Sequence, residues 1–231
     1  PKVLYSDYHH ISGASKGNKD HLKEFSAYIN SNYPHSKSIL EVGCNDGTLL
    51  NFLDDLGYES VGVDPAENLS QGKAIKVYKD FFGTNFIKKL KKTHDNFDII
   101  IGLNVFANND SFIDMFKACE SLLSDSGTLI IEVAYSPSTI GGGNFDTIYH
   151  EHVCSYSLKS IENALGYCNL YVNNAELIST QGGSIRVSAV KKKFENKSDS
   201  YSKIVKYEKE IGITQMNYYN SISSSINAKV K

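Results

Sequence analysis

The sequence lacks several features that mark common classes of small protein. Its 231 residues contain no internal repeat and no apolar run that approaches the length of a membrane span. The opening stretch, PKVLYSDYHH, lacks the basic and then apolar pattern of a signal peptide. We therefore expect a cytoplasmic protein with no membrane partner.

Cysteine pairs at metal-binding spacing are also absent. No C-x-x-C pair occurs among the four cysteines, which are Cys44, Cys119, Cys154 and Cys168. This spacing argues against both a zinc knuckle and a disulfide framework. We expect reduced thiols and no bound metal.

An excess of charge of one sign is missing as well. The chain has 24 basic and 26 acidic residues, for a net charge of −2. Binding to nucleic acid would call for a clustered positive excess, so we expect no nucleic acid partner. The contents of 41% hydrophobic and 22% charged residues are ordinary for a folded protein. The length suits one sizeable domain, with or without appendages.

Short apolar runs alternate with helical patterns through the first half of the chain. The helical patterns are residues 20–29, with Asn18 or Asp20 as cap, 48–57 and 110–127. The expected strands are 37–42, 58–65, 73–82, 97–106 and 127–135. This alternation over residues 36–135 predicts a parallel sheet with helices on both faces, whose ligands lie beyond the carboxyl ends of the strands.

The pattern changes after residue 135. Residues 136–145 are expected to be a loop and 157–167 a helix, while 168–179 and 182–192 should close the sheet as an antiparallel pair. Apolar residues at spacings of three and four predict one long helix from residue 198 onward, weakened by Gly212. We divide the chain into an N-terminal helical segment (1–35), a cofactor-binding domain (36–190) and a C-terminal helical extension (191–231).

A glycine turn joins the first expected strand to the following helix. In EVGCNDGTLL, residues 41–50, Gly43 and Gly47 allow the backbone to approach a ligand closely. Asp64 ends the next strand, seventeen residues beyond Gly47, where a carboxylate can accept both hydroxyls of a ribose. The turn differs from the G-x-G-x-x-G dinucleotide pattern, because three residues separate its glycines.

These residues resemble the E-x-G-x-x-x-G-x-L signature and the ribose-binding acid of class I S-adenosylmethionine-dependent methyltransferases. The resemblance implies a Rossmann-like methyltransferase fold with a mostly parallel seven-stranded sheet, and S-adenosyl-L-methionine as cofactor. It places Asp80 and Phe81 beside the adenine, and Asn104 in a loop that covers the methionine part. The implied cofactor-binding residues are Glu41, Gly43, Asn45, Gly47, Asp64, Asp80, Phe81 and Asn104.

The stretch FDTIYHEHVCSY, residues 145–156, concentrates histidines and tyrosines after a run of three glycines. By itself it fits a metal pair, an acid/base site or a polar strand edge. Together with GGSIRV, it resembles the Tyr-x-Glu-His region of sugar C-methyltransferases that act on nucleotide-linked 4-keto deoxysugars. The resemblance implies that Tyr149, Glu151 and His152 are the catalytic residues and that the acceptor is a nucleotide-linked sugar or a related cell-surface polysaccharide precursor.

The chemistry of carbon methylation explains these residue types. A carbon beside a ketone becomes nucleophilic when a base removes its proton, and a histidine has the required pKa range. We expect His152 to be that base and Tyr149 to stabilise the enolate oxygen. Glu151 would orient the histidine or hold sugar hydroxyls. If the run is extended, His150 points to the other face and is equally consistent with a structural role.

Several alternatives remain open. Metal binding through His150 and His152 lacks further ligands, and the stretch could be a structural loop. Arg186 could contact a substrate phosphate or be a paired side chain at a strand edge. Methylation of oxygen or nitrogen on another small precursor, and a non-catalytic cofactor-binding subunit, also fit.

The chain departs from this sugar C-methyltransferase subfamily at both ends. It has neither the zinc module before the cofactor domain nor the second α/β domain after it, so it is a shortened relative or part of a longer chain. The apolar face of the C-terminal helix could dock a partner or form a homodimer.

Overall fold

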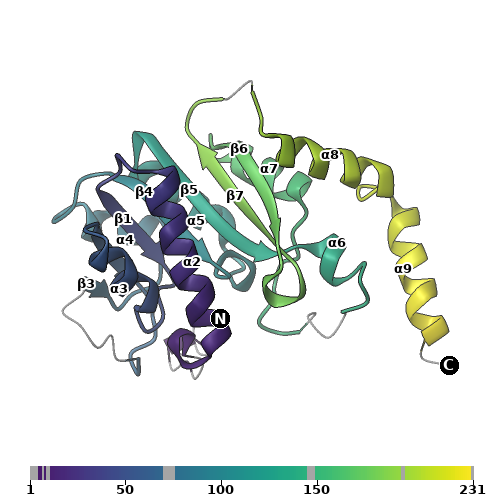
Figure 1. Cartoon of the computed structure of the whole chain (residues 1–231), viewed down its shortest axis with the longest axis horizontal. Coiled ribbons are helices and arrows are strands. Elements are labelled where there is room, and N and C mark those ends of the chain that lie inside the picture. Colours follow the sequence, from purple (N-terminus) through teal and green to yellow (C-terminus); the bar gives the residue numbers. More distant parts are fainter. Residues whose placement is uncertain are drawn as a thin grey trace. The chain divides into compact units, whose positions relative to one another are not determined.

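The computed structural model describes residues 5–6, 8, 11–69, 76–144, 149–193 and 196–229 (Figure 1). Residues 73–75 of the expected third strand and 145–148 of the histidine-rich stretch lie outside the described residues, as do positions 7, 9 and 10 near the start of the expected N-terminal segment. The end of the expected C-terminal helix, residues 230–231, also lies outside them.

Seven strands form one sheet in the order β3-β2-β1-β4-β5-β7-β6. β1 pairs in parallel with β2 and β4, β2 pairs in parallel with β3, and β6 and β7 are antiparallel. The bounds are β1 Ser38–Val42, β2 Glu59–Val63, β3 Lys76–Tyr78, β4 Phe97–Leu103, β5 Leu123–Ala134, β6 Tyr171–Ile178 and β7 Ser184–Val190. The predicted seven-stranded, mostly parallel sheet is therefore confirmed, including its antiparallel end.

Helices connect these strands as the alternating pattern predicted. The α-helices are α2 Lys16–Asn32, α3 Thr48–Asp55, α4 Thr84–Leu90, α5 Phe112–Leu122, α6 Ser136–Thr139, α7 Leu158–Tyr167, α8 Asp199–Ile211 and α9 Met216–Lys229. Short 3-10 turns occur at η1 Ser12–Ala14, η2 Phe106–Asn108 and η4 Thr180–Gly182. The short helices α4 and α6 were not predicted, because seven and four residues are too few for a clear periodic pattern.

The chain forms two compact units. The first comprises Pro1–Leu103 and Asp114–Leu129, and the second comprises Asn104–Ile113 and Ile130–Lys231. In the first, α2 packs against α3, and α3 packs against β2. In the second, α7 and α8 pack against β6 (Figure 1).

Two expected helix boundaries were wrong. The long C-terminal helix is instead two helices, because Gly212 adopts a left-handed conformation (φ 68°) that ends α8. The cap of α2 is Ser15, whose side chain accepts a hydrogen bond from the Asn18 backbone N–H, and not Asn18 or Asp20.

Candidate functional site

The glycine turn after β1 has the backbone geometry that its sequence predicts. Gly43, Asn45 and Gly47 all have positive φ, at 70°, 52° and 74°. Most side chains disfavour this region, whereas glycine and asparagine adopt it readily. Three such residues within five positions fold the backbone into a tight cradle that opens directly into α3.

Asp64 fastens this turn to the end of β2. Its carboxylate accepts hydrogen bonds from the backbone N–H of Asn45 and of Ala66, both at 2.9 Å. The side chain is 8% exposed. A carboxylate offers about four acceptor positions, so these two bonds leave capacity for two ligand hydroxyls. Two ribose hydroxyls, which the spacing from Gly47 predicts at this position, would therefore find acceptor positions on Asp64.

Glu41 is a buried acid at the end of β1. Its Oε2 atom has no hydrogen-bond partner among the described residues. Burial, followed by the charges of Asp64 and Asp46, raises the pKa of Glu41 well above its usual value. A buried, unsatisfied polar atom beside the glycine cradle is suited to a polar ligand group.

Two N-terminal residues also contact the glycine turn, and the sequence analysis did not assign them to the site. The backbone N–H of Ser12 donates to Oδ1 of Asn45 at 2.9 Å, and that of Gly13 donates to Oδ2 of Asp46 at 3.1 Å. A Cβ at Gly13 would collide with the Thr48 side chain. The glycine at this position is the signal in the sequence that could have indicated the close approach.

The residues expected beside the adenine lie just after β3. Asp80 is paired with Lys89 at 2.8 Å, and its other oxygen accepts the Phe81 backbone N–H at 3.0 Å. The sequence did not indicate a structural role for Lys79, the residue before Asp80. Its ammonium group donates to the carbonyl oxygens of Ala66 and Leu69, at 2.6 and 3.1 Å. It thereby ties the loop after Asp64 to the loop after β3.

Asn104 directly follows β4 and begins the second unit. It has a positive φ of 56°, and its backbone N–H donates to the Glu132 carbonyl at 2.8 Å. The loop therefore leaves the strand through a sharp left-handed bend, which asparagine tolerates. The 3-10 turn η2 follows, with Phe106 and Ala107 buried.

The histidine segment, defined here as residues 149–156, begins with a turn. The His152 backbone N–H donates to the Tyr149 carbonyl at 3.0 Å, so residues 149–152 form a turn and are not extended. A turn brings its first and fourth side chains to one side, whereas an extended strand separates them. The Tyr149 and His152 rings consequently lie 4.5 Å apart between centroids.

Tyr149 also interacts with its other neighbours in this turn. The exposed His150 ring meets it edge-on at 5.7 Å, and Glu151 and His152 are half-buried. Burial, followed by the charge of Glu151, raises the pKa of the Tyr149 phenol. The phenol therefore keeps its proton near neutral pH and can donate it in a hydrogen bond.

The rest of the histidine segment is bonded to the loop after β4. The Cys154 backbone N–H donates to the Ala107 carbonyl at 3.1 Å, and the buried Tyr156 hydroxyl donates to the Phe106 carbonyl at 3.1 Å. The part of the histidine segment that follows His152 is thus bonded to the loop that Asn104 begins, within the second unit.

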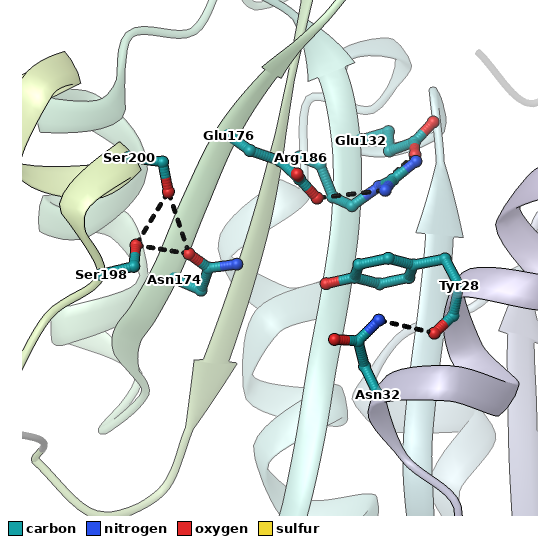
Figure 2. Close-up of polar contacts among 8 residues, drawn as sticks. All are labelled: Tyr28, Asn32, Glu132, Asn174, Glu176, Arg186, Ser198 and Ser200. Carbon is teal, nitrogen blue, oxygen red and sulfur yellow. Dashed lines mark hydrogen bonds and ion pairs between the residues drawn. The ribbon is translucent and has the colours of Figure 1, made fainter.

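Arg186 is held in an ion-pair cluster (Figure 2). Its guanidinium lies 2.7 Å from the fully buried Glu132 carboxylate on β5 and 3.1 Å from Glu176 on β6. The Arg186 side chain is 11% exposed. Of the two alternatives, the paired side chain is what the structure shows.

The described part of the chain contains neither a metal-binding cluster nor a helix that could span a membrane. No group of three or more His, Cys, Asp or Glu side chains there could hold a metal ion. No helix there is long and apolar enough to cross a membrane. None of the four cysteines, all of which are described, forms a disulfide.

Comparison with known proteins assigns the family. The sequence matches the methyltransferase domain family over residues 11–173. The chain belongs to this family. A solved structure that shares its fold, magnesium protoporphyrin IX methyltransferase of Synechocystis PCC 6803, contains bound SAM. The recognition of a methyltransferase from the glycine turn is therefore confirmed.

This methyltransferase is similar to the C-methyltransferase NovU of Streptomyces niveus, with 25% identity over 194 residues. The match covers 82% of this chain and 46% of NovU, so the chain spans about half the length of that curated relative.

Solved structures share the fold. Magnesium protoporphyrin IX methyltransferase of Synechocystis PCC 6803 with bound SAH has a TM-score of 0.57 and 18% identity, covering 76% of this chain and 84% of that one. A SAM-dependent methyltransferase of Archaeoglobus fulgidus has a TM-score of 0.60 and 17% identity, covering 74% and 93%.

Proposed function

We propose that this methyltransferase transfers the methyl group of S-adenosylmethionine to a nucleotide-linked sugar or a related cell-surface polysaccharide precursor. The reaction we favour is methylation of a carbon beside a ketone. The observation that carries the proposal is the pair of Tyr149 and His152, whose rings lie 4.5 Å apart in one turn. The similarity to a protein named as a C-methyltransferase supports the same chemistry.

The residues of the first unit fit the cofactor. The glycine cradle suits close approach of a ligand, the spare acceptor capacity of Asp64 suits ribose hydroxyls, and the unsatisfied oxygen of Glu41 suits a polar group. When bound, S-adenosylmethionine supplies an electrophilic methyl group on a sulfonium sulfur. We assign its binding to Glu41, Gly43, Asn45, Gly47 and Asp64. Asp80 and Phe81, after β3, complete the proposed set in this unit. Asn104, after β4, lies in the second unit, and its contact with the cofactor stays a prediction from the sequence.

The residues of the histidine segment supply the acid and base. His152 removes the proton from the carbon beside the ketone, and the electron pair of that bond forms the enolate. The protonated phenol of Tyr149 donates a hydrogen bond to the enolate oxygen, which stabilises its charge. Glu151, the neighbour of His152, orients the acceptor or the histidine. The enolate carbon would then be the nucleophile for the methyl group that the bound cofactor supplies.

The first step can be measured without methyl transfer. The chain, saturated with S-adenosylhomocysteine in deuterated water, should exchange the proton beside the ketone of a nucleotide-linked 4-keto sugar. His152→Ala should slow this exchange about 100-fold or more, because a positioned base contributes that much. The matched control is His150→Ala, which should leave the rate nearly native. Exchange at the native rate in His152→Ala would remove this residue from the mechanism.

A further inference from the structure

A buried carboxylate on α8 lies outside the region that matches the methyltransferase family. Glu208 is 4% exposed. Acidic side chains are rarely buried unless they are well paired. Oε1 of Glu208 accepts hydrogen bonds from the backbone N–H of Leu158 at 2.6 Å and from the hydroxyl of Tyr135 at 3.0 Å. Oε2 accepts from the backbone N–H of Lys159 at 3.0 Å.

These bonds complete the start of α7. The first four N–H groups of a helix lack partners within it, and they form the positive end of the helix dipole. Ser157 and Ser160 satisfy two of them reciprocally, at 2.9 and 3.1 Å. Glu208 satisfies the other two, at Leu158 and Lys159, and supplies a negative charge where the dipole favours it.

The start of α7 is also where the histidine segment ends. The Tyr156 carbonyl accepts the Ser136 backbone N–H at 2.7 Å, and Tyr156 bridges in parallel with Tyr135. The Tyr156 hydroxyl in turn reaches the Phe106 carbonyl. Glu208 thus contacts Tyr135, which pairs with Tyr156, and the start of α7, which follows Tyr156 in the sequence.

The beginning of α8 is anchored separately. Its cap, Ser198, donates to Oδ1 of Asn174 on β6 at 2.5 Å, and the Ser200 hydroxyl lies 2.9 Å from that of Ser198 (Figure 2). α8 is therefore attached to β6 at one end and to the start of α7 near the other. This attachment gives Glu208 a fixed position from which to act.

We propose that Glu208 is a positioning residue for the histidine segment. It fixes the point at which this segment enters α7, and so holds Tyr149 and His152 in register with the loop after β4. The catalytic part of this inference rests on the proposed function. Reacting groups must be held within a fraction of an ångström, so a looser segment would slow the reaction without weakening cofactor binding.

Hydrogen–deuterium exchange tests the positioning without any acceptor. With S-adenosylhomocysteine bound, Glu208→Ala should speed exchange in a peptide covering 149–156 about tenfold, because local opening becomes easier. A peptide covering 41–50 should exchange as in the native chain. The matched control is Glu210→Ala, an exposed acid on the same helix, which should change neither peptide.

Two milder variants keep the test decisive if Glu208→Ala does not fold. Glu208→Gln removes one acceptor oxygen, and Tyr135→Phe removes one donor. Faster exchange in 149–156, without a rise in 41–50, supports the proposal in either variant. Native exchange there, or an equal rise in both peptides, overturns it.

Kinetics provide the second readout. In folded Glu208→Gln, kcat should fall about tenfold while the dissociation constant for S-adenosylmethionine stays within about twofold of native. A purely structural role would lower the folded fraction and leave kcat per folded molecule unchanged, which would contradict the proposal. If the native chain transfers no methyl group, the proposed function fails, but the exchange measurement still decides the role of Glu208.

Discussion

Replacing Asp64 with alanine should weaken cofactor binding strongly. The carboxylate is 8% exposed and accepts two backbone hydrogen bonds, from Asn45 and Ala66. We propose that its remaining acceptor positions bind the two ribose hydroxyls. A hydrogen bond to a charged group contributes about 1.5 kcal/mol or more, so the loss of two costs about 3 kcal/mol of binding free energy. This corresponds to roughly a hundredfold weaker affinity.

Titration calorimetry with S-adenosylmethionine measures this affinity directly. Asp64→Ala also leaves two backbone donors without their acceptor, so we expect about 2 kcal/mol or more of lost stability, measured by chemical unfolding. Asp64→Asn keeps one acceptor oxygen, so its affinity and stability should lie between those of the native chain and those of Asp64→Ala. The control is Glu59→Gln, an exposed acid at the other end of β2, which should change neither quantity. Native affinity in folded Asp64→Ala would refute the assignment of the ribose site.

Three further substitutions test the site and its support. The raised pKa of buried Glu41 means that the folded chain keeps a proton that the unfolded chain releases, so stability falls as pH rises above the usual carboxyl range. Glu41→Gln should remove this fall in stability with pH, measured by thermal unfolding between about pH 5 and pH 8; an unchanged fall would contradict the raised pKa of Glu41. Gly13→Ala should weaken cofactor affinity severalfold by calorimetry, because its Cβ collides with side chains of the glycine turn, whereas Gly17→Ala meets nothing within 4 Å; equal affinities would show that the contact is unimportant. Arg186→Met should cost about 3 kcal/mol in chemical unfolding, because it removes the guanidinium from buried Glu132; native stability would count against the ion pair.

Local patterns were sufficient to predict the sheet and the glycine turn. The central strands are almost wholly buried, so their residues read as continuous apolar runs. Gly43, Gly47 and Asp64 were identified because a sharp turn restricts the residue types at fixed spacing. These features depend on residues that are neighbours in the sequence, so a single sequence is enough to predict them.

The remaining features depend on contacts between distant segments. The turn from Tyr149 to His152 carries no glycine or proline to mark it. Glu208 is one of several charged residues on an amphipathic helix, and nothing nearby in the sequence indicates that it is buried against α7, fifty residues away. The break at Gly212 was partly visible, but the apolar spacing on both sides favoured one continuous helix.

The position of the transferred methyl group tests the central proposal most directly. The chain would be incubated with S-adenosylmethionine labelled in its methyl group and a nucleotide-linked 4-keto sugar, and the product analysed by NMR. We predict label on the carbon beside the ketone, and its loss in His152→Ala. Label on an oxygen or a nitrogen, or full transfer by His152→Ala, would contradict carbon methylation with His152 as the base.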